Sequence, residues 1–185
     1  NLPPHVLVMT ATPIPRTLAM SLYGDLDISL IKELPPGRKA IKTVHRYDKN
    51  RLSVFRFIRE EINNGKQIYI VYPLIKESQK LDFKDLMDGY ESISREFQMP
   101  DYQISIMHGQ MKSSDKEYEM ERFAKGETDI MVATTVIEVG VNVPNASVMI
   151  IESAERFGLS QLHQLRGRVG RGNDQSYCIL MTKDN

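Results

Sequence analysis

Three arginines fall within six positions near the carboxyl end of the chain, in the run QLHQLRGRVGRG from Gln161 to Gly172. Guanidinium groups are costly to bury without partners, so a segment that only covered a core would not concentrate them. Their planar forks of donors suit phosphate oxygens, and interspersed glycines let the backbone approach a ligand closely. The run therefore indicates phosphate chemistry, with a solvated, salt-bridged helix face as the alternative. The arginines are Arg166, Arg168 and Arg171.

Three further polar motifs each follow or end an apolar, strand-like run. In VATTVIEVGVNVPNA (residues 132–146), Thr134 and Thr135 can bind a nucleic-acid phosphate through hydroxyls and free amides. Glu138 or Asn142 can hydrogen-bond a ribose hydroxyl, and a capped short helix is the alternative. TATPIPRT (10–17) offers the hydroxyls of Thr10 and Thr12 to a ligand, and a rigid strand-to-helix turn is the alternative. In MHGQM (107–111), Gly109 can free amides for a phosphate, or His108 is structural.

Two absences limit what this chain does alone. A phosphate-binding loop needs G-x-x-x-x-G-K-[ST], but before the pair Gly65-Lys66 the first glycine is replaced by Glu60, and Gln67 follows. The chain also has no Asp-Glu dipeptide to supply a metal-holding aspartate and an adjacent base. It therefore cannot assemble a complete nucleotide-hydrolysing site, although it can supply arginines to one.

The composition is that of an ordinary globular protein. Hydrophobic residues make up 41% of the 185 positions and charged residues 26%, with 24 Lys+Arg against 24 Asp+Glu, so any nucleic-acid contact must be local. Cys178 is the single cysteine and the four histidines are scattered, which excludes an internal disulfide and predicts no metal site. No apolar stretch approaches the roughly 20 residues that span a bilayer. These features fit a cytoplasmic protein.

Short aliphatic runs alternate with longer helical patterns, which predicts an α/β fold with a mostly parallel sheet. In such sheets ligands bind at the loops that leave the carboxyl ends of the strands. Ser114 followed by Glu117 resembles a capping box for the fourth helix. The expected strands are 5–9, 41–45, 67–71, 103–107, 129–133, 148–151 and 177–181. The expected helices are 15–23, 50–63, 83–97, 114–125 and 160–166. In the second of these, the apolar residues recur at helical spacing, namely Leu52, Phe55, Ile58 and Ile62.

The chain is expected to contain one domain and a piece of another. Residues 33–39, with Pro35-Pro36-Gly37, are typical of a linker. The preceding strand, turn and helix are too small to stand alone, so residues 1–34 are interpreted as the tail of a preceding domain. Residues 35–185 then form the main domain. The polar stretch 76–88 is expected to be an exposed loop or insertion.

The four motifs, in this order, resemble the second motor domain of superfamily 2 DNA helicases. TATPIPRT and QLHQLRGRVGRG are similar to the RecG branch, and the transcription-repair coupling translocases are the nearest rival. The resemblance covers nearly the whole chain, from Thr10 to Gly172. It implies a RecA-like, three-layer helicase C-terminal domain with the general fold of P-loop NTPases.

The resemblance also implies a role for each motif. Arg168 and Arg171 match arginines that reach the γ-phosphate of ATP held by the first motor domain, and Gln164 matches a glutamine near the attacking water. Family members usually carry aspartate at the position of Asn142. The other matching positions are Glu138, Gly140 and Asn142 for ATP, Thr134, Thr135, His108 and Gly109 for the DNA backbone, and Thr10, Thr12 and Arg16 for coupling hydrolysis to movement.

The implied complete enzyme is an ATP-dependent helicase that acts with Mg²⁺ on branched DNA, such as forks and junctions, in bacterial recombination and repair. Its phosphate loop and DNA-binding wedge domain would lie outside this chain, which alone would bind no cofactor and be inactive. One alternative is a non-catalytic nucleic-acid-binding or protein-binding module. Another is a small-molecule enzyme, which lacks a nucleophile or base beside the arginines.

Overall fold

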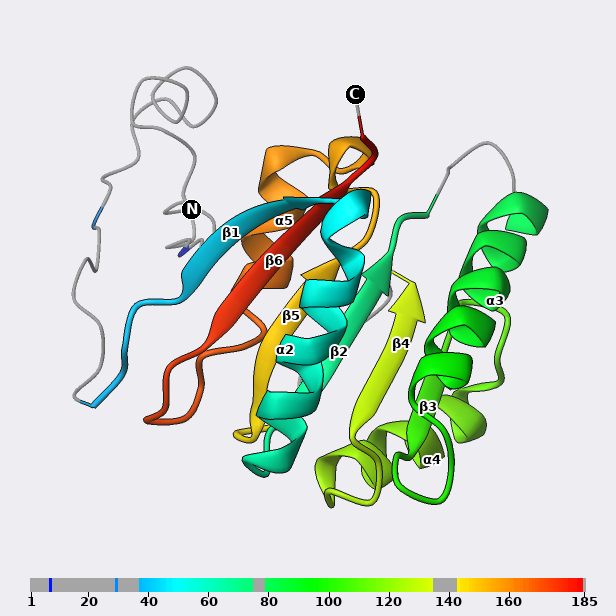
Figure 1. Cartoon of the computed structure of the whole chain (residues 1–185), viewed down its shortest axis with the longest axis horizontal. Helices are drawn as coiled ribbons and strands as arrows, with labels where there is room; N and C mark the ends of the chain where they lie inside the picture. Colours follow the sequence, from blue (N-terminus) through cyan, green and yellow to red (C-terminus); the bar gives the residue numbers. More distant parts are fainter. Residues whose placement is uncertain (1–6, 8–28, 30–36, 75–78, 135–142, 185) are drawn as a thin grey trace, which may run out of the picture. The chain divides into compact units, whose positions relative to one another are not determined.

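The computed structural model describes residues 7, 29, 37–74, 79–134 and 143–184 (Figure 1). The chain divides into two compact units, residues 1–34 and 35–185. In the first unit only two residues are described. The expected strand 5–9 and helix 15–23 therefore lie outside the described residues, as do Thr10, Thr12 and Arg16. That this unit is the tail of a preceding motor domain stays a prediction.

The second unit is built on a six-stranded sheet in the order β1-β6-β5-β2-β4-β3, and every neighbouring pair is parallel. This confirms the predicted α/β fold, because each connection must cross back over a face of the sheet before the next strand starts. The strands are β1 (Lys42–Tyr47), β2 (Gln67–Tyr72), β3 (Ile104–Met107), β4 (Ile130–Thr134), β5 (Ala146–Ile151) and β6 (Tyr177–Thr182).

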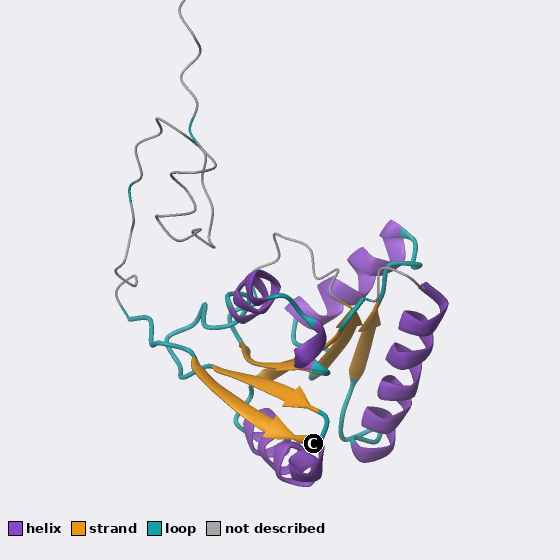
Figure 2. Ribbon diagram, turned by 90° about the horizontal axis from the view of Figure 1, so that it is seen from above, coloured by secondary structure: helices purple, strands orange, loops and turns teal. Residues whose placement is uncertain are grey.

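Helices cover both faces of the sheet and make three layers (Figure 2). Helices α2 (Arg51–Asn63) and α3 (Gln79–Glu96) lie on one face, and α4 (Ser113–Ala124) and α5 (Leu159–Arg166) lie on the other. Two short 3₁₀ helices, η1 (Asp48–Asn50) and η2 (Ala154–Arg156), follow β1 and β5. No described helix is long and apolar enough to cross a membrane.

Alternating side chains of the central strands supply both cores. Ile68 and Ile70 of β2 pack with α2 and α3, whereas Tyr69 and Val71 of the same strand pack with α4 and α5. Strands β2, β4 and β5 are buried almost throughout, so they consist of nearly continuous apolar runs. Each fully buried aliphatic side chain contributes about 1.5–3 kcal/mol from burial. Strand β1 ends the sheet, and its Lys42, Thr43, His45 and Arg46 are exposed.

Three local expectations were wrong. In α2 the side chain of Leu52 is 74% exposed, and the inward stripe consists of Val54, Phe55 and Ile58. Helix α3 begins at Gln79, inside the stretch expected to be a loop, because Leu86, Ile93 and Phe97 form a buried stripe at helical spacing. Helix α4 begins at Ser113 without a side-chain cap, and the Ser114 hydroxyl bonds Asp115 instead.

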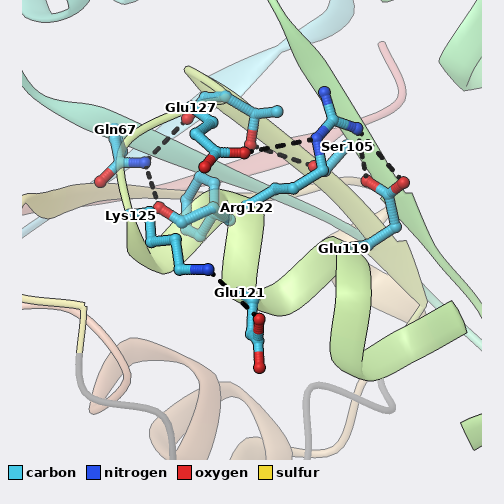
Figure 3. Close-up of polar contacts among 9 residues, drawn as sticks. Gln67, Ser105, Glu119, Glu121, Arg122, Lys125 and Glu127 are labelled. Atoms are coloured by element: carbon cyan, nitrogen blue, oxygen red, sulfur yellow. Dashed lines mark hydrogen bonds and ion pairs between the residues drawn. The ribbon is translucent and has the colours of Figure 1, made fainter. Parts of the chain in front are cut away.

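A buried polar cluster ties α4 to the amino-terminal ends of β2 and β3 (Figure 3). The Gln67 amide donates to the carbonyl oxygens of Phe123, at 2.6 Å, and Thr128, at 2.7 Å. The Ser105 hydroxyl donates to Thr128 Oγ1 at 3.0 Å. Outside this cluster, Arg122 pairs with Glu119 and Glu127. The Phe123 carbonyl also accepts from the backbone amide of Gly126, at 3.1 Å. Gln67 is therefore needed most by the buried carbonyl of Thr128.

We expect Gln67→Leu to lower the free energy of unfolding by about 1–3 kcal/mol, because it leaves the buried carbonyl group of Thr128 without its donor. Urea denaturation of the 185-residue chain measures this. Gln98→Leu is the matched control, since its exposed amide donates to a single carbonyl, that of Arg95, and should change stability by less than about 0.5 kcal/mol. Equal effects of the two substitutions would contradict the assignment.

Candidate functional site

The arginine run starts on α5 and continues into the loop before β6. Gly158 precedes the helix, and its amide donates to Gln161 Oε1 at 3.2 Å. The helix ends at Arg166, where the amide of Arg168 donates to the carbonyl of Leu165 at 3.0 Å. Leu165 and Val169 are buried in the core shared with α4. These apolar anchors fix the backbone on both sides of Arg168.

The loop that carries Arg171 lies at the amino-terminal edge of the sheet. A Cβ atom added to Gly170 would lie 2.9 Å from Cγ1 of Ile41, which precedes β1. One added to Gly172 would lie 3.0 Å from the carbonyl oxygen of Pro144, which precedes β5. The arginine run therefore ends at the edge opposite to the carboxyl ends of the strands, where the general rule for such sheets places ligands. Helix α5 must return the chain from the end of β5 to the start of β6, and the run follows that return.

Arg168 and Arg171 are half-buried cations whose side chains form no hydrogen bond or ion pair with any residue that the structure describes. Elsewhere on the second unit, Arg51, Arg59 and Arg156 each pair with a carboxylate. Burial raises the pKa of Tyr69 to about 12, and the positive charges of Arg171 and Arg168 act against that rise. Both guanidinium groups therefore act electrostatically on the Tyr69 hydroxyl, and no described carboxylate neutralises them.

The flanking residues differ from these two. Gln164 is exposed on α5, in keeping with a role toward a ligand rather than the core. Arg166 contacts His163 at 3.1 Å and lies near Cys178. Burial raises the pKa of Cys178 to about 11, while the charge of Arg166 opposes this, so the thiol is un-ionised at neutral pH. Cys178 is therefore a core residue.

A second group of predicted residues lies at the carboxyl edge. Met107 of β3 is opposite Ala133 of β4, so the next residues, His108 and Thr134, lie side by side. The Lys116 ammonium donates to the carbonyl of Gly109 at 3.2 Å. Partial burial, together with the charge of Lys116, lowers the pKa of His108, so its ring is neutral at pH 7. This edge therefore offers polar but uncharged groups from His108 and Thr134.

The Thr134 hydroxyl is a candidate ligand group because it is buried without a partner. Thr134 is 2% exposed, and its Oγ1 forms no hydrogen bond within the described part of the chain. A buried hydroxyl that remains unpaired costs free energy, so it is retained where something else supplies the partner. Ser105, at the other end of the neighbouring strand, instead bonds Thr128.

The remaining predicted residues, Thr135, Glu138, Gly140 and Asn142, lie in 135–142, outside the described residues. The positions where the chain resumes are still informative. Thr134 ends β4 at the carboxyl edge, whereas Pro144 lies beside Gly172 at the amino edge. The motif therefore starts at the edge that holds His108 and ends at the edge that holds Arg171.

Sequence reasoning missed a buried ion pair at the carboxyl edge. The guanidinium of Arg51 donates to both carboxylate oxygens of Glu152, at 2.7 and 2.9 Å, and to Asp48 at 2.6 Å. This fork joins the start of α2 to the end of β5, and the hydrogen bond to Glu152 raises the pKa of Arg51. The two residues are 101 positions apart, so no local pattern reveals the pair. Among the described residues no cluster of His, Cys, Asp or Glu could hold a metal ion.

Thr134→Val should leave the free energy of unfolding unchanged or raise it by up to about 1 kcal/mol, because it removes an unpaired buried hydroxyl at nearly constant shape. Ser105→Ala, which breaks a buried hydrogen bond, should lower it by about 1 kcal/mol. Urea denaturation of both variants tests the contrast. A loss of stability in Thr134→Val equal to that of Ser105→Ala would show that the Thr134 hydroxyl has a partner within the fold.

Comparison with known proteins agrees with this arrangement. The model of the helicase conserved C-terminal domain matches residues 51–173. ATP-dependent DNA helicase RecG of Synechocystis sp. is 55% identical over 97% of this chain and 21% of the relative. The RecG of Aquifex aeolicus is 54% identical over 98% and 22%. The chain thus spans about a fifth of the length of the curated relatives it matches.

Solved structures give the same result. The structure of RecG bound to a three-way DNA junction matches 95% of this chain and 22% of that one, with 47% identity and a TM-score of 0.75. Domain 2 of the DEAD-box helicase Mss116p, at 18% identity and a TM-score of 0.55, shares the fold. The predicted resemblance is confirmed: the chain belongs to the helicase conserved C-terminal domain family, and within the second motor domains of superfamily 2 helicases it is similar to RecG.

Proposed function

We propose that this chain is the second motor domain of a RecG-like, ATP-dependent DNA helicase acting on branched DNA. The observation that carries the proposal is the pair of half-buried guanidinium groups, Arg168 and Arg171, without partners among the described residues. They occur in a chain at least half identical to several RecG proteins. A buried cation that its own fold does not neutralise favours an anion supplied from outside.

The anion is the γ-phosphate of ATP, held with Mg²⁺ by the first motor domain of the same polypeptide. Arg168 and Arg171 stabilise the negative charge that develops on the transferred phosphoryl group, an effect worth about 10³–10⁵ in rate in other nucleotidases. Gln164, exposed on α5, orients the attacking water. Glu138, Gly140 and Asn142 contact the nucleotide. Since Asn142 has no charge, its contribution is a hydrogen bond to a ribose hydroxyl.

The carboxyl edge contacts the DNA backbone. Thr134, whose hydroxyl has no partner among the described residues, and His108, whose ring is neutral, directly follow the paired residues Ala133 and Met107, and Gly109 and Thr135 adjoin them in sequence. Uncharged donors of this kind fix the position of a phosphate without reading the bases. DNA and nucleotide thus meet opposite edges of one rigid sheet. Thr10, Thr12 and Arg16 couple the closure of the two motor domains to movement along DNA.

Branched DNA is the proposed substrate because one similar protein, RecG, has been solved bound to a three-way DNA junction. The wedge domain that separates the strands would belong to the same polypeptide. The relatives come from bacteria, so the proposed setting is recombination and repair in the bacterial cytoplasm. A steep salt dependence comes from phosphates that Lys or Arg neutralise, so the uncharged contacts of the carboxyl edge should add little to it.

In the longer protein that contains this chain, Arg171→Ala and Arg168→Ala should each lower DNA-stimulated ATP hydrolysis by about 10³-fold, because an uncharged side chain cannot neutralise the transferred phosphate. Steady-state ATPase assays measure kcat. Arg56→Ala is the control, since Arg56 is exposed on α2, on the opposite face of the sheet from α5. Near-normal turnover in the Arg171 and Arg168 variants would reject the proposal and favour a non-catalytic module.

The isolated 185-residue chain should hydrolyse no ATP above background, because it has no phosphate-binding loop or Asp-Glu motif. A phosphate-release assay with and without branched DNA measures this. Mixing the chain with a separately expressed first motor domain provides the positive control. Robust activity of the chain alone would show that it holds a nucleotide site of its own.

A further inference from the structure

Two glycines flank Arg171, and each lies against a different part of the fold. Gly170 has φ +80°, a conformation that L side chains rarely adopt, and an added Cβ would lie 2.9 Å from Cγ1 of Ile41. An added Cβ on Gly172 would lie 3.0 Å from the carbonyl oxygen of Pro144. Backbone oxygen cannot move aside as a side chain can. The backbone of Arg171 is therefore held between the segment before β1 and the segment before β5.

The third glycine of the run has no such requirement. Gly167 has φ −69°, and an added Cβ would lie 3.5 Å from the carbonyl oxygens of Gln164 and His163, which is ordinary contact. The close approach is thus specific to the positions on either side of Arg171. It does not follow from the glycine content of the run.

Further contacts fasten the same loop. The Lys66 ammonium, from the turn between α2 and β2, pairs with Asp174. The side-chain amide of Gln175 donates to the carbonyl of Ala40 at 2.8 Å. The backbone amide of Lys42 donates to the carbonyl of Ser176 at 2.9 Å. Residues 40–42 therefore run alongside residues 170–176. The loop is joined to three separate parts of the domain.

We infer that Gly170, Gly172, Ile41 and Pro144 are positioning residues for Arg171, setting how far its guanidinium reaches toward the γ-phosphate. This inference rests on the proposed function, because it gives Arg171 a phosphate to reach. A misplacement of about 1 Å at a reacting centre lowers turnover by as much as about 10²-fold. An added methyl group at residue 172 must displace the loop from Pro144, since the 3.0 Å contact is to backbone.

In the longer protein, Gly172→Ala and Gly170→Ala should lower kcat for DNA-stimulated ATP hydrolysis by about tenfold or more. The KM for ATP and the affinity for branched DNA should change less than about threefold, because no atom that binds either ligand is removed. Gly167→Ala is the matched control and should stay within about twofold of the parent. Adding Ile41→Ala to Gly170→Ala should restore part of kcat, since it removes the 2.9 Å contact but not the backbone strain.

Arg171→Ala in the same series separates the two proposals. Normal turnover in Arg171→Ala would overturn the proposed function. A collapse in Arg171→Ala, with Gly172→Ala matching Gly167→Ala, would overturn the positioning inference alone. A parallel fall in kcat and DNA affinity would also overturn it, as the mark of general unfolding. If Gly172→Ala does not fold, Ile41→Ala and Gln175→Ala test the inference instead, because these two substitutions remove contacts of the loop without adding atoms. A parental kcat in both variants would overturn the inference.

Discussion

The all-parallel sheet imposes the constraint on which the whole arrangement depends. Every connection must carry the chain from the carboxyl edge back to the amino edge before the next strand begins. Helix α5 makes that return between β5 and β6, and Leu165 and Val169 anchor it to the core. Consequently Arg168 and Arg171 lie at one edge, whereas His108 and Thr134 lie at the other. One sheet thus keeps these two groups of residues apart while joining them mechanically, and under the proposed function it separates the ATP contacts from the DNA contacts.

Arg51 differs from Arg168 and Arg171 in how its charge is neutralised. Arg51 is satisfied by Glu152 and Asp48, so it fixes the end of β5 against α2 and has little left to offer a ligand. Arg168 and Arg171 are half-buried without a carboxylate among the described residues. Their partial burial costs desolvation free energy, and no ion pair with a described residue offsets that cost. A fold retains such groups where a bound anion pairs with them.

Much of the fold could be predicted from local pattern. The predicted strands 67–71 and 129–133 are apolar apart from their first residues, Gln67 and Asp129, as buried parallel strands require, and the structure has β2 and β4 there. Choices that depend on distant partners could not be predicted. Leu52 satisfies the helical spacing as well as Val54 does, and only the sheet beneath α2 decides which of the two is buried. The Arg51–Glu152 fork joins residues far apart in sequence for the same reason.

For the site, residue type was predictable and location was not. The run from Gln161 to Gly172 indicates phosphate chemistry by its composition alone. Its position at the amino edge follows from the direction of α5. The general rule that ligands bind at the carboxyl edge of a parallel sheet does not predict that position. The side-by-side placement of His108 and Thr134 needed the register between β3 and β4.

Strand β1 is one of the two outermost strands of the described sheet, and its exposed side chains have a consequence for the behaviour of the protein at high concentration. A free strand edge is a template on which another molecule can add a strand, the first step toward aggregation. Lys42 and Arg46 place like charges along this edge, so two copies that approached each other there would repel. The basic side chains of β1 thus disfavour the addition of a second copy at this edge.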